Sequence, residues 1–286
     1  MGTELLESYE ARKELAFIQE TPGDVVIASR GDEIQGVVLL RERHWDSGHF
    51  GIRVGSIEVL RGFGRKPSHN RDILSSLMSF VSAKLGAFRY VTCRTTTRDQ
   101  AAANILESFG FEYLTGMVTL GFHFAHDEVR EVRGSNISAV RKGEVSRLAG
   151  IARRSFVCDR FHQETGLPKS NSDSLHAEWI RNCCLEGLAD TVLVSRDGRT
   201  LQGFVACRLD RELHPTVGEI VLLGVAPEMR GKGVGSRLVN AALRWFDGLA
   251  ELVLVRTEVS NYPSLRTYQK ENFTILSASN YFRRWM

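Results

Sequence analysis

The chain of 286 residues lacks the marks of several specialised protein classes. Its five cysteines are an odd number, and no CxxC pair or His cluster at metal-ligand spacing occurs, so neither a disulfide framework nor a zinc site is expected. No apolar run approaches the roughly 18 residues of a membrane span, and the acidic N-terminal stretch lacks the basic region of a signal peptide. These absences predict a cytoplasmic protein with no metal and no membrane partner.

The chain also lacks a strong charge of either sign. Lys and Arg number 37 against 34 Asp and Glu, a formal net charge of +3, far from the excess carried by proteins that bind nucleic-acid phosphates. No nucleic-acid partner is therefore expected, and any anionic ligand must be bound locally. With 43% apolar residues and 6 prolines the composition is typical of a globular protein, and the length predicts about two domains.

Apolar periodicity predicts the same kinds of element in both halves of the chain. In the first half the expected strands cover residues 25–28, 35–40, 55–60 and 90–94, and the expected helices cover 70–85 and 98–109. In the second half the expected helices cover residues 138–156, 174–188 and 233–246, and the expected strands cover 191–195, 203–209, 218–225 and 252–257. This alternation of strands and helices predicts an α/β fold.

A shift of 162 positions tests whether the two halves are copies of one unit. It aligns residues 86–114 with 248–276 and gives six identities in 29 positions, where unrelated sequences of typical composition would give about two. Chance similarity stays open on identity alone. Together with the matching order of elements, the alignment predicts two tandem copies of one α/β unit, at residues 1–130 and 131–286.

The most informative stretch is residues 218–246, where an apolar strand runs through a short loop into a helix. The loop, Arg230–Gly235, reads RGKGVG. Its alternate glycines let backbone N–H groups point at a ligand and the following helix N-terminus adds a positive dipole end, so the loop suits a pyrophosphate. A glycine-rich turn without a ligand stays open, and neither a Rossmann loop nor a Walker loop fits the pattern and its position.

This stretch resembles the acyl-CoA-binding motif Q/R-x-x-G-x-G/A of the Gcn5-related N-acetyltransferase (GNAT) superfamily. The residues that match that motif are Arg230, Gly233 and Gly235. The residues that match the superfamily's closing element are Asn261, Tyr268 and Phe273. Tyr268 lies seven residues after Asn261, two helical turns, so both are expected to project from one side of a final helix. Asn272 stands where glycine is usual, and asparagine tolerates the left-handed backbone conformation that glycine supplies there.

The resemblance implies two tandem GNAT-like units, each with a mixed, mostly antiparallel sheet flanked by helices. It also implies acetyl-CoA as cosubstrate, with its pantetheine arm on strand backbone where the sheet splays and its pyrophosphate on the glycine loop. The implied cofactor-binding residues are Leu223, Gly224, Val225, Arg230, Gly231, Lys232, Gly233, Val234, Gly235, Ser236, Asn261 and Tyr268. The first unit is expected to be degenerate, because the 162-residue shift places His69 and Arg71 where the second unit has Gly231 and Gly233.

More narrowly, the chain resembles the dTDP-fucosamine acetyltransferase family, whose members acetylate a dTDP-linked 4-amino-4,6-dideoxyhexose. The likeness rests on HWDSGHFG at 44–51, on DRFHQETGLP and AEWIRNCC within 159–184, and on SASNYFRRW at 277–285. The implied substrate-binding residues are Trp45, Asp46, Arg160, Phe161 and His162. Core packing of Trp45 and Phe161, and a structural ion pair of Arg160, stay open.

Two residues are expected to carry the chemistry. In the superfamily the residue matching Tyr268 protonates the departing CoA thiolate, a plausible transfer because a phenol has a pKa of about 10 and a thiol about 8.5. The first copy has Leu106 at this position, and a packed core tyrosine remains the alternative. Glu219, at the start of the strand that leads into the loop, is the expected base for the amine, with His162, a water chain or a backbone carbonyl as alternatives.

The sequence therefore predicts an acetyl-CoA-dependent N-acetyltransferase in which the amino group of a nucleotide-linked amino sugar attacks the thioester directly. One alternative is a tandem GNAT enzyme that acetylates another small amine, such as an antibiotic, a pseudodisaccharide or a protein N-terminus. A non-catalytic acyl-CoA-binding scaffold is the other. The predicted partner is a small-molecule amine, and a homodimer stays open.

Overall fold

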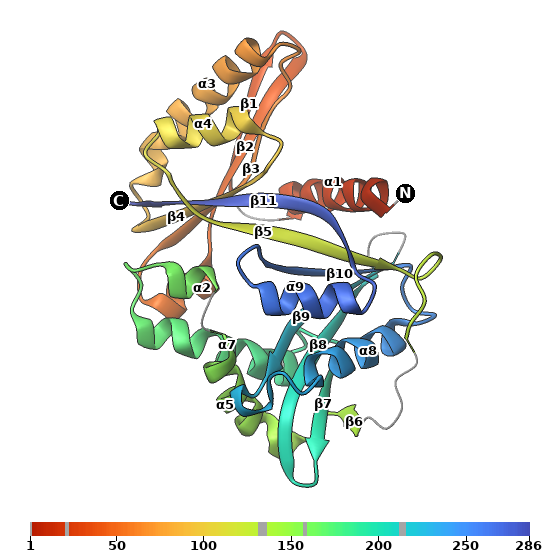
Figure 1. Cartoon of the computed structure of the whole chain (residues 1–286). Coiled ribbons are helices and arrows are strands. Elements are labelled where there is room, and N and C mark those ends of the chain that lie inside the picture. The colour runs from red at the N-terminus through yellow and green to blue at the C-terminus, as the bar shows by residue number, and fades with distance from the viewer. Residues whose placement is uncertain (1, 21–22, 131–135, 157–158, 212–215) are drawn as a thin grey trace. The chain divides into compact units, whose positions relative to one another are not determined.

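The computed structural model describes residues 2–20, 23–130, 136–156, 159–211 and 216–286 (Figure 1). The chain divides into two compact units, each of which combines segments distant in sequence. The N-terminal unit consists of Glu7–Met117 and Ala278–Met286. The C-terminal unit consists of the residues up to Leu6 and of Val118–Ser277.

The N-terminal unit is built on an antiparallel meander extended by a parallel strand. Its elements are β1 (Asp24–Arg30), β2 (Glu33–Glu42), α2 (His44–Phe50), β3 (Val54–Gly62), α3 (Pro67–Leu85), β4 (Tyr90–Thr96) and α4 (Gln100–Ser108), after α1 (Gly2–Glu20), which begins in the other unit. Strands β1, β2 and β3 are antiparallel, and β4 runs parallel to β3. The apolar faces of α3 and α4 pack on these strands and form the core of the unit.

The C-terminal unit repeats this plan with more helices. Its elements are β6 (Ile137–Ala139), a 3₁₀ turn (Lys142–Glu144), α5 (Val145–Ser155), α6 (Arg160–Gln163), α7 (Lys169–Leu185), β7 (Thr191–Asp197), β8 (Thr200–Asp210), β9 (Val217–Val225), a second 3₁₀ turn (Pro227–Met229), α8 (Val234–Phe246), β10 (Leu252–Glu258) and α9 (Tyr262–Lys270). Strands β6 to β9 are antiparallel, and β10 runs parallel to β9.

Two long strands, β5 (Glu112–His123) and β11 (Thr274–Trp285), contribute to both units. Residues 118–123 of β5 lie next to β10 in the C-terminal unit. Residues 279–285 of β11 pair antiparallel with β4 in the N-terminal unit. The bounds of the compact units therefore differ from a division of the chain at residue 130. In each unit the strands are extended by the last strand of the other half of the chain, and that strand pairs an edge that would otherwise be open.

Helices cover both faces of the sheet in the C-terminal unit. Phe204 of β8 belongs to a core cluster with residues of α5 and α7, whereas its neighbour Gly203 approaches Leu238 of α8. Successive residues of a strand point to opposite faces, so α5 and α7 lie on one face and α8 on the other. A side chain at Gly203 would come within 3.1 Å of Leu238 and 2.6 Å of the Gly224 carbonyl, which explains the glycine.

The predicted repeat is visible in the bounds of the elements. A shift of 162 residues carries β4, α4 and β5 onto β10, α9 and β11 residue for residue. A shift of 163 carries β3 onto β9, and a shift of 167 carries β1 onto β7. The pairing irregularity between Leu39 and Leu40 of β2 recurs between Ala206 and Cys207 of β8, again 167 residues later. The α/β fold with a mixed sheet flanked by helices is thus confirmed.

One predicted element is wrong, and several were not predicted. The helix expected over 138–156 begins only at Val145, because residues 137–139 pair with β7 and Lys142–Glu144 form a 3₁₀ turn. The buried pair Glu144–Arg196, 2.6 Å apart, holds that turn against β7. The elements without a predicted counterpart are α1, α2, α6, β5, β6 and β11. In β5, residues 115–122 are buried on both faces, which removes the alternation that reveals a strand.

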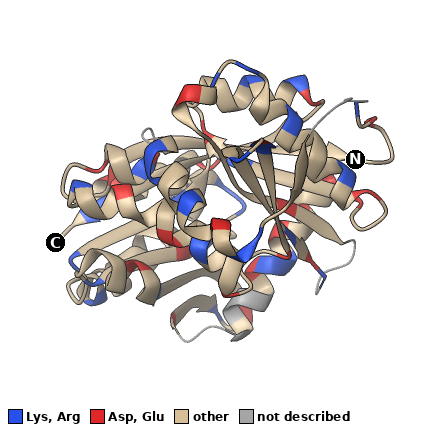
Figure 2. Cartoon of the chain, turned by 90° about the horizontal axis from the view of Figure 1, so that it is seen from below, with Lys and Arg blue, Asp and Glu red and all other residues tan. Residues whose placement is uncertain are grey.

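Charged side chains are interspersed over the elements, with blue and red positions adjacent on many helices and loops (Figure 2). This distribution agrees with the formal net charge of +3. In the described ranges, no helix combines the length and apolar character that crossing a bilayer requires.

Candidate functional site

A splayed gap opens between β9 and β10 of the C-terminal unit. Their parallel pairing runs from Val217–Leu252 to Ile220–Val255 and then ends, although both strands continue. On its other edge β9 stays paired with β8 as far as Val225, with one irregularity opposite Ala206 and Cys207. Residues 221–225 therefore present one backbone edge that is unpaired in the described register, the kind of edge to which an extended ligand can add.

The three residues expected to bind pantetheine lie on this edge. Gly224 is required for packing, since a side chain there would meet the ring of Phe204 at 2.6 Å. The carbonyl oxygen of Val225 accepts a hydrogen bond from Ser155 Oγ at 2.9 Å. The backbone carbonyl of Val225 is thus already engaged. Leu223 lies in the middle of this edge, and on its other side it is paired with Val205 of β8.

The glycine loop leads directly into the N-terminus of α8. Gly231 and Gly233 have φ angles of 74° and 73°, the left-handed region that glycine adopts without strain. Gly233 is the N-cap of α8, and among the described residues no side chain caps this helix. Because the N–H groups of the first helical turn have no intrahelical acceptor, they can bind an anion together with the dipole of the helix.

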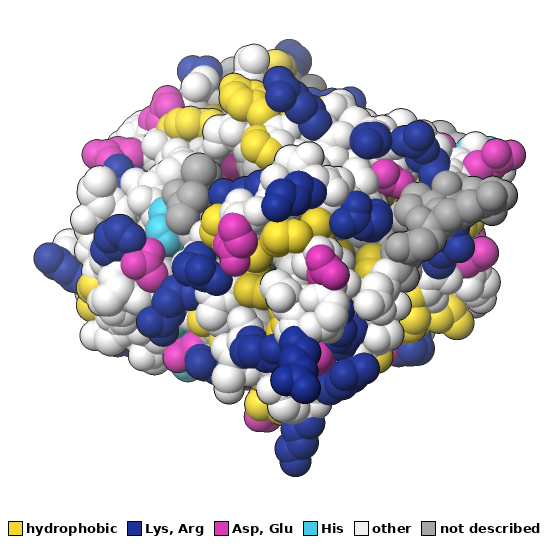
Figure 3. Space-filling view, turned by 60° about the horizontal axis from the view of Figure 1, so that its bottom comes forward, with side chains coloured by type: hydrophobic (Ala, Val, Ile, Leu, Met, Phe, Trp, Pro, Cys, Tyr) yellow, Lys and Arg dark blue, Asp and Glu magenta, His cyan; other side chains and the backbone are white. Residues whose placement is uncertain are grey.

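The cations of the loop lie at its surface. Arg230 donates to the carbonyl oxygen of Ser155 at 2.9 Å, which ties the loop to the end of α5. The Lys232 ammonium lies 3.8 Å from the Met229 sulfur, and Arg237 donates to the Lys232 carbonyl oxygen at 3.0 Å. On the face shown in Figure 3, basic and acidic side chains are both spread over the surface.

Tyr268 of α9 is buried, with 4% of its surface exposed. Its ring packs on Phe273 with the centroids 5.7 Å apart. Burial, and to a smaller degree the charge of Glu258, raises the pKa of Tyr268 above its usual value. The phenol therefore stays protonated through the neutral pH range, where it can serve as a proton donor and not as a base.

Asn261 is the N-cap of α9 rather than a residue on its face. Its Oδ1 accepts from the Ser264 N–H at 3.4 Å, and its Nδ2 donates to Thr257 Oγ1 at 3.1 Å. At the other end of the helix, Asn272 has a φ of 65°, and it is the one non-glycine residue with positive φ among those described. The left-handed turn expected at this asparagine is confirmed.

Glu219, the expected base, lies between two arginines. Its carboxylate forms an ion pair with Arg208, its cross-strand neighbour on β8, and a second with Arg256 of β10 at 3.4 Å. The glutamate side chain is 8% exposed. Its carboxylate oxygens are thus engaged by guanidinium groups, an arrangement suited to joining three strands and poorly suited to accepting a proton from substrate.

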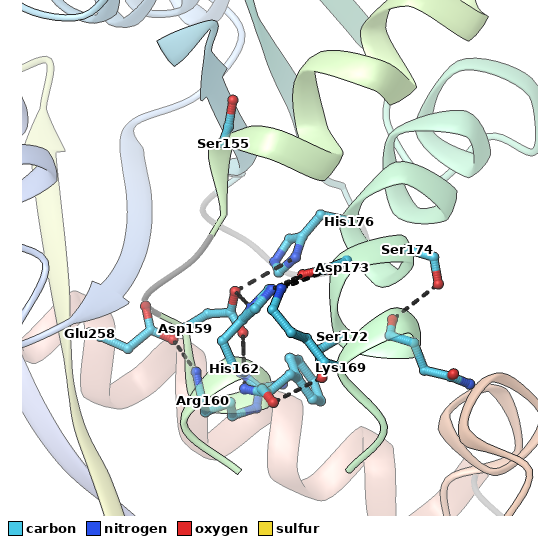
Figure 4. A network of polar contacts seen from close by, with 12 residues as sticks. Ser155, Asp159, Arg160, His162, Lys169, Ser172, Asp173, Ser174, His176 and Glu258 are labelled. Carbon is cyan, nitrogen blue, oxygen red and sulfur yellow. Dashed lines mark hydrogen bonds and ion pairs between the residues drawn. The ribbon is translucent and has the colours of Figure 1, made fainter. Parts of the chain in front are cut away.

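His162, the alternative base, is held on both sides by carboxylates (Figure 4). Its Nδ1 lies 2.7 Å from Asp159 Oδ2 and its Nε2 lies 3.1 Å from Asp173 Oδ1. Asp173 also accepts from Lys169 at 2.9 Å, and that bond holds the pKa of Asp173 below its usual value. With both ring nitrogens bonded to carboxylates, His162 has no free nitrogen for a substrate and instead joins α6 to α7.

His176 lies behind His162 in the same network. It stacks on Phe156 with centroids 4.0 Å apart, and burial lowers its pKa to about 4, so the ring is neutral at neutral pH. Its Nδ1 is buried 3.7 Å from Asp159 Oδ2, without a hydrogen-bond partner in the part of the chain that the structure describes. The histidine therefore supports the network through packing.

Glu258, a residue that the sequence analysis did not select, lies at the same site. It is the last residue of β10, past the end of the β9 pairing, and is 8% exposed. Its Oε1 accepts from the Arg160 N–H at 3.4 Å. Burial raises the pKa of this carboxyl above its usual value. The comparison of the two copies could have singled out Glu258, because the equivalent position of the first copy, 162 residues earlier, is Thr96.

The remaining expected substrate contacts fall in both units. Trp45 and Asp46 lie in α2 of the N-terminal unit, where Trp45 is 44% exposed and Asp46 pairs with Arg43 at 3.1 Å. Core packing is therefore excluded for Trp45. In the C-terminal unit, the Arg160 guanidinium lies over the ring of Phe161 at 4.3 Å. Within the described ranges no group of three or more His, Cys, Asp or Glu side chains is placed to hold a metal.

Comparison with known sequences relates this site to acetyltransferases. Residues 156–273 match the model of the acetyltransferase (GNAT) family. The chain is 32% identical to the mycothiol acetyltransferase of Stackebrandtia nassauensis over 46% of this chain and 47% of that protein, so it spans about half the length of this relative. A longer match, 20% identical over 88% of this chain and 84% of the relative, is to the spore coat polysaccharide biosynthesis protein SpsD of Bacillus subtilis.

Solved structures extend the likeness to both units. The GCN5-related N-acetyltransferase from Sphaerobacter thermophilus matches with a TM-score of 0.65 and 11% identity, over 96% of this chain and 85% of that chain. A tandem GNAT protein from the clavulanic acid biosynthesis pathway matches with a TM-score of 0.56 and 10% identity, over 92% and 83%. At such identities the likeness concerns the fold, and it agrees with the predicted pair of GNAT-like units.

Proposed function

We propose that the chain is an acetyl-CoA-dependent N-acetyltransferase, because residues 156–273 match the model of the acetyltransferase (GNAT) family. One observation carries the proposal. The unpaired edge of β9 leads directly into a glycine loop and an uncapped helix N-terminus, so a backbone edge and an anion site follow each other along the chain. An extended thioester that ends in a pyrophosphate has the same two parts in the same order.

In this proposal acetyl-CoA binds only the second copy of the repeated unit. The backbone of Leu223–Val225 holds the pantetheine arm, and the loop from Arg230 to Ser236 holds the pyrophosphate. The loop suits such an anion, since Gly231 and Gly233 have the left-handed backbone that turns N–H groups inward. Gly233 also leaves little room for a side chain, because a Cβ there would lie 3.3 Å from Arg237. Asn261 acts through the helix cap that positions α9.

The chemistry that we propose is direct attack of a neutral amine on the thioester carbonyl. A C–N bond forms, the C–S bond breaks, and Tyr268 donates its phenol proton to the departing thiolate. The buried phenol remains protonated at neutral pH, as this role requires. Holding the two reactants in one gap, with backbone N–H groups on the thioester oxygen, supplies most of the acceleration.

For the acceptor we propose a nucleotide-linked 4-amino-4,6-dideoxyhexose in the cytoplasm. The resemblance to the dTDP-fucosamine acetyltransferase family and the long match to a polysaccharide biosynthesis protein support this substrate class. Arg160 and Phe161 offer a cation and an aromatic face. His162 would act through α6, because both of its ring nitrogens are engaged. The matches to mycothiol acetyltransferases favour a second candidate, another small amine acceptor.

Calorimetry with acetyl-CoA tests the loop assignment. We expect one site per chain. The substitution Gly233→Val places a branched side chain in the left-handed N-cap and should weaken binding by about 100-fold or more, equivalent to about 2.7 kcal/mol. The matched control is Arg71→Val at the equivalent exposed position of the first copy, which should leave affinity unchanged. Unaltered affinity in a folded Gly233→Val protein would refute the loop assignment.

Acetyl transfer to a panel of amines tests the acceptor. The panel contains a dTDP-linked 4-amino-4,6-dideoxyhexose, glucosamine, an aminoglycoside and a peptide with a free N-terminus. We expect the nucleotide sugar to give the highest kcat/KM, because binding of its nucleotide and pyrophosphate positions the amine. Turnover of another member without the nucleotide sugar favours the second candidate.

A further inference from the structure

The buried carboxylate at the end of β10, beyond the residues paired with β9, has no role in the chemistry described above. We propose that Glu258 is the base that accepts the proton lost by the acceptor amine during acetylation. This inference rests on the proposed acetyltransferase function and deepens it, since the superfamily likeness directed attention to Glu219.

The geometry of the strand end is the first support. Glu258 lies three residues past Val255, the last β10 residue paired with β9, and therefore on the part of β10 that borders the splayed gap. The side chain is buried rather than turned to solvent. Its negative charge contributes to the raised pKa of Tyr268, so the carboxylate and the phenol interact electrostatically.

The polar network of Figure 4 is the second support, because it holds this carboxylate in place. Asp159 caps α6 by accepting from the N–H groups of Phe161 and His162 at 2.9 and 3.2 Å. This cap orients the Arg160 N–H toward Glu258 Oε1 at 3.4 Å. His162 and Asp173 then fix α6 to the start of α7. The network thereby holds a backbone donor against one oxygen of this carboxylate.

The charged groups that face Glu258 favour proton uptake. Burial is the largest influence and raises its pKa, and the negative charge of Asp159 acts in the same direction. Arg160 and two backbone N–H groups act against it. Tyr268 faces it from α9 as a neutral phenol. A carboxyl whose pKa is raised toward neutrality is a stronger base for an ammonium group than an ordinary glutamate.

The other candidates in the unit are already engaged. Glu219 is paired with Arg208 and Arg256, and both ring nitrogens of His162 are bonded to carboxylates. The repeat adds an independent argument, because the first copy has exposed Thr96 at the position of Glu258, just as it has Leu106 at the position of Tyr268. The carboxylate occurs in the copy that carries the loop and the phenol.

The proposed step balances as one net proton transfer. The amine nitrogen forms a bond to the acetyl carbon while the C–S bond of the thioester breaks. The proton lost by the nitrogen passes to Glu258, and the thiolate takes the proton of Tyr268. Glu258 then returns its proton to the phenolate, directly or through one water, so that the products are the amide and the free thiol of CoA.

The pH dependence of Glu258→Gln tests this role, with release of CoA thiol as the readout and the four-amine panel as acceptors. In the wild type, kcat/KM should rise with pH as Glu258 ionises. The isosteric variant should lose about 10²- to 10⁴-fold in kcat, keep its affinity for acetyl-CoA, and retain only the limb set by the amine itself. Glu258→Asp should restore part of the rate and the wild-type limb.

The control is Glu251→Gln, an exposed glutamate just before the other end of β10, which should leave the profile unchanged. A Glu258→Gln protein within twofold of wild type, with an unchanged acid limb and chemistry rate-limiting, overturns the proposal. Absence of acetyl-CoA binding or of transfer to all four amines in the wild type refutes the proposed function instead. In that case ¹³C NMR of labelled glutamate still decides, because an ordinary pKa at Glu258 overturns its role as base.

Discussion

The segment from β3 to β5 and the segment from β9 to β11 have the same order of strands and α-helices, and they have capping and turn residues at equivalent positions. Asp99 and Asn261 each cap a helix by accepting from the N–H group three residues on. Gly110 and Asn272 each turn the chain with a left-handed φ, of 78° and 65°. Turns and caps therefore persist where the backbone path requires them.

The same two segments differ at three positions to which we assign chemistry. In the second copy these positions are Gly233, Glu258 and Tyr268. Their counterparts in the first copy are Arg71, Thr96 and Leu106. The comparison teaches that the fold depends on caps, turns and buried apolar side chains, whereas binding and catalysis depend on a few positions that can change while the fold remains.

The largest difference between the copies is expected at Tyr268. Tyr268→Phe should keep the affinity for acetyl-CoA and lower kcat by about 10²- to 10⁴-fold, because it removes the proton donor and keeps the packed ring. The matched variant Leu106→Met should leave kcat unchanged. Since the pKa of Tyr268 is raised, the fall in wild-type rate on phenol ionisation should occur at higher pH than for free tyrosine, and the Phe variant should lack it.

Rapid-mix measurements would establish that chemistry limits kcat before these rates are compared. A Phe variant within about twofold of wild type would then make Tyr268 a packing residue and solvent the proton source. That result would remove one of the three chemical differences between the copies.

The next largest expected effect is a loss of stability that should be equal in the two copies. Phe111 and Phe273 occupy equivalent positions after α4 and α9, and both are 2% exposed. Phe111→Ala and Phe273→Ala should each lower the free energy of unfolding by about 3–5 kcal/mol, through lost burial and the cavity that remains. Denaturant unfolding of both variants measures this, and a difference of more than about 2 kcal/mol between them would contradict equal structural roles.

A smaller effect is expected at the left-handed turns. Gly110→Ala introduces a side chain at a φ of 78° and should destabilise the fold by about 1–2 kcal/mol. Asn272→Gly should be neutral or slightly stabilising, because glycine adopts this conformation without strain. Thermal unfolding distinguishes the two. Equal destabilisation by both changes would show that the Asn272 side chain, which donates to the Glu128 carbonyl at 3.1 Å, contributes more than the turn.

The smallest expected effect is the loss of stability when the N-cap residues of α4 and α9 are replaced. Asp99→Ala and Asn261→Ala should each cost about 1 kcal/mol of stability, through loss of an N-cap hydrogen bond. If Asn261 acts only through its cap, both variants should keep the affinity for acetyl-CoA within twofold, as measured by calorimetry. A selective loss of affinity in Asn261→Ala would assign this asparagine a direct contact with the cosubstrate.

Much of the fold was predictable because short-range patterns determine it. The strand–loop–helix from β9 to α8 follows from an apolar run, alternate glycines and a 3.6-residue period within one stretch. By contrast, the short helix α6 has no predicted counterpart, since its stability depends on Asp159 at its N-cap and on a contact with α7 eleven residues away. Glu258 was overlooked for a related reason: a glutamate at a strand end is ordinary until its burial is known.

The sequence by itself determined the repeat, the glycine loop and the left-handed turn at Asn272, because each depends on neighbouring residues or on a local period. Only the tertiary structure decided that the carboxylate of Glu219 is held in ion pairs and that the buried carboxylate of Glu258 is the one we propose as the base. Glu219 meets Arg208 and Arg256 across strands that are 11 and 37 residues away in sequence. The exchange of β5 and β11 between the units was also decided at this level, since strand pairing joins backbone groups regardless of side-chain identity.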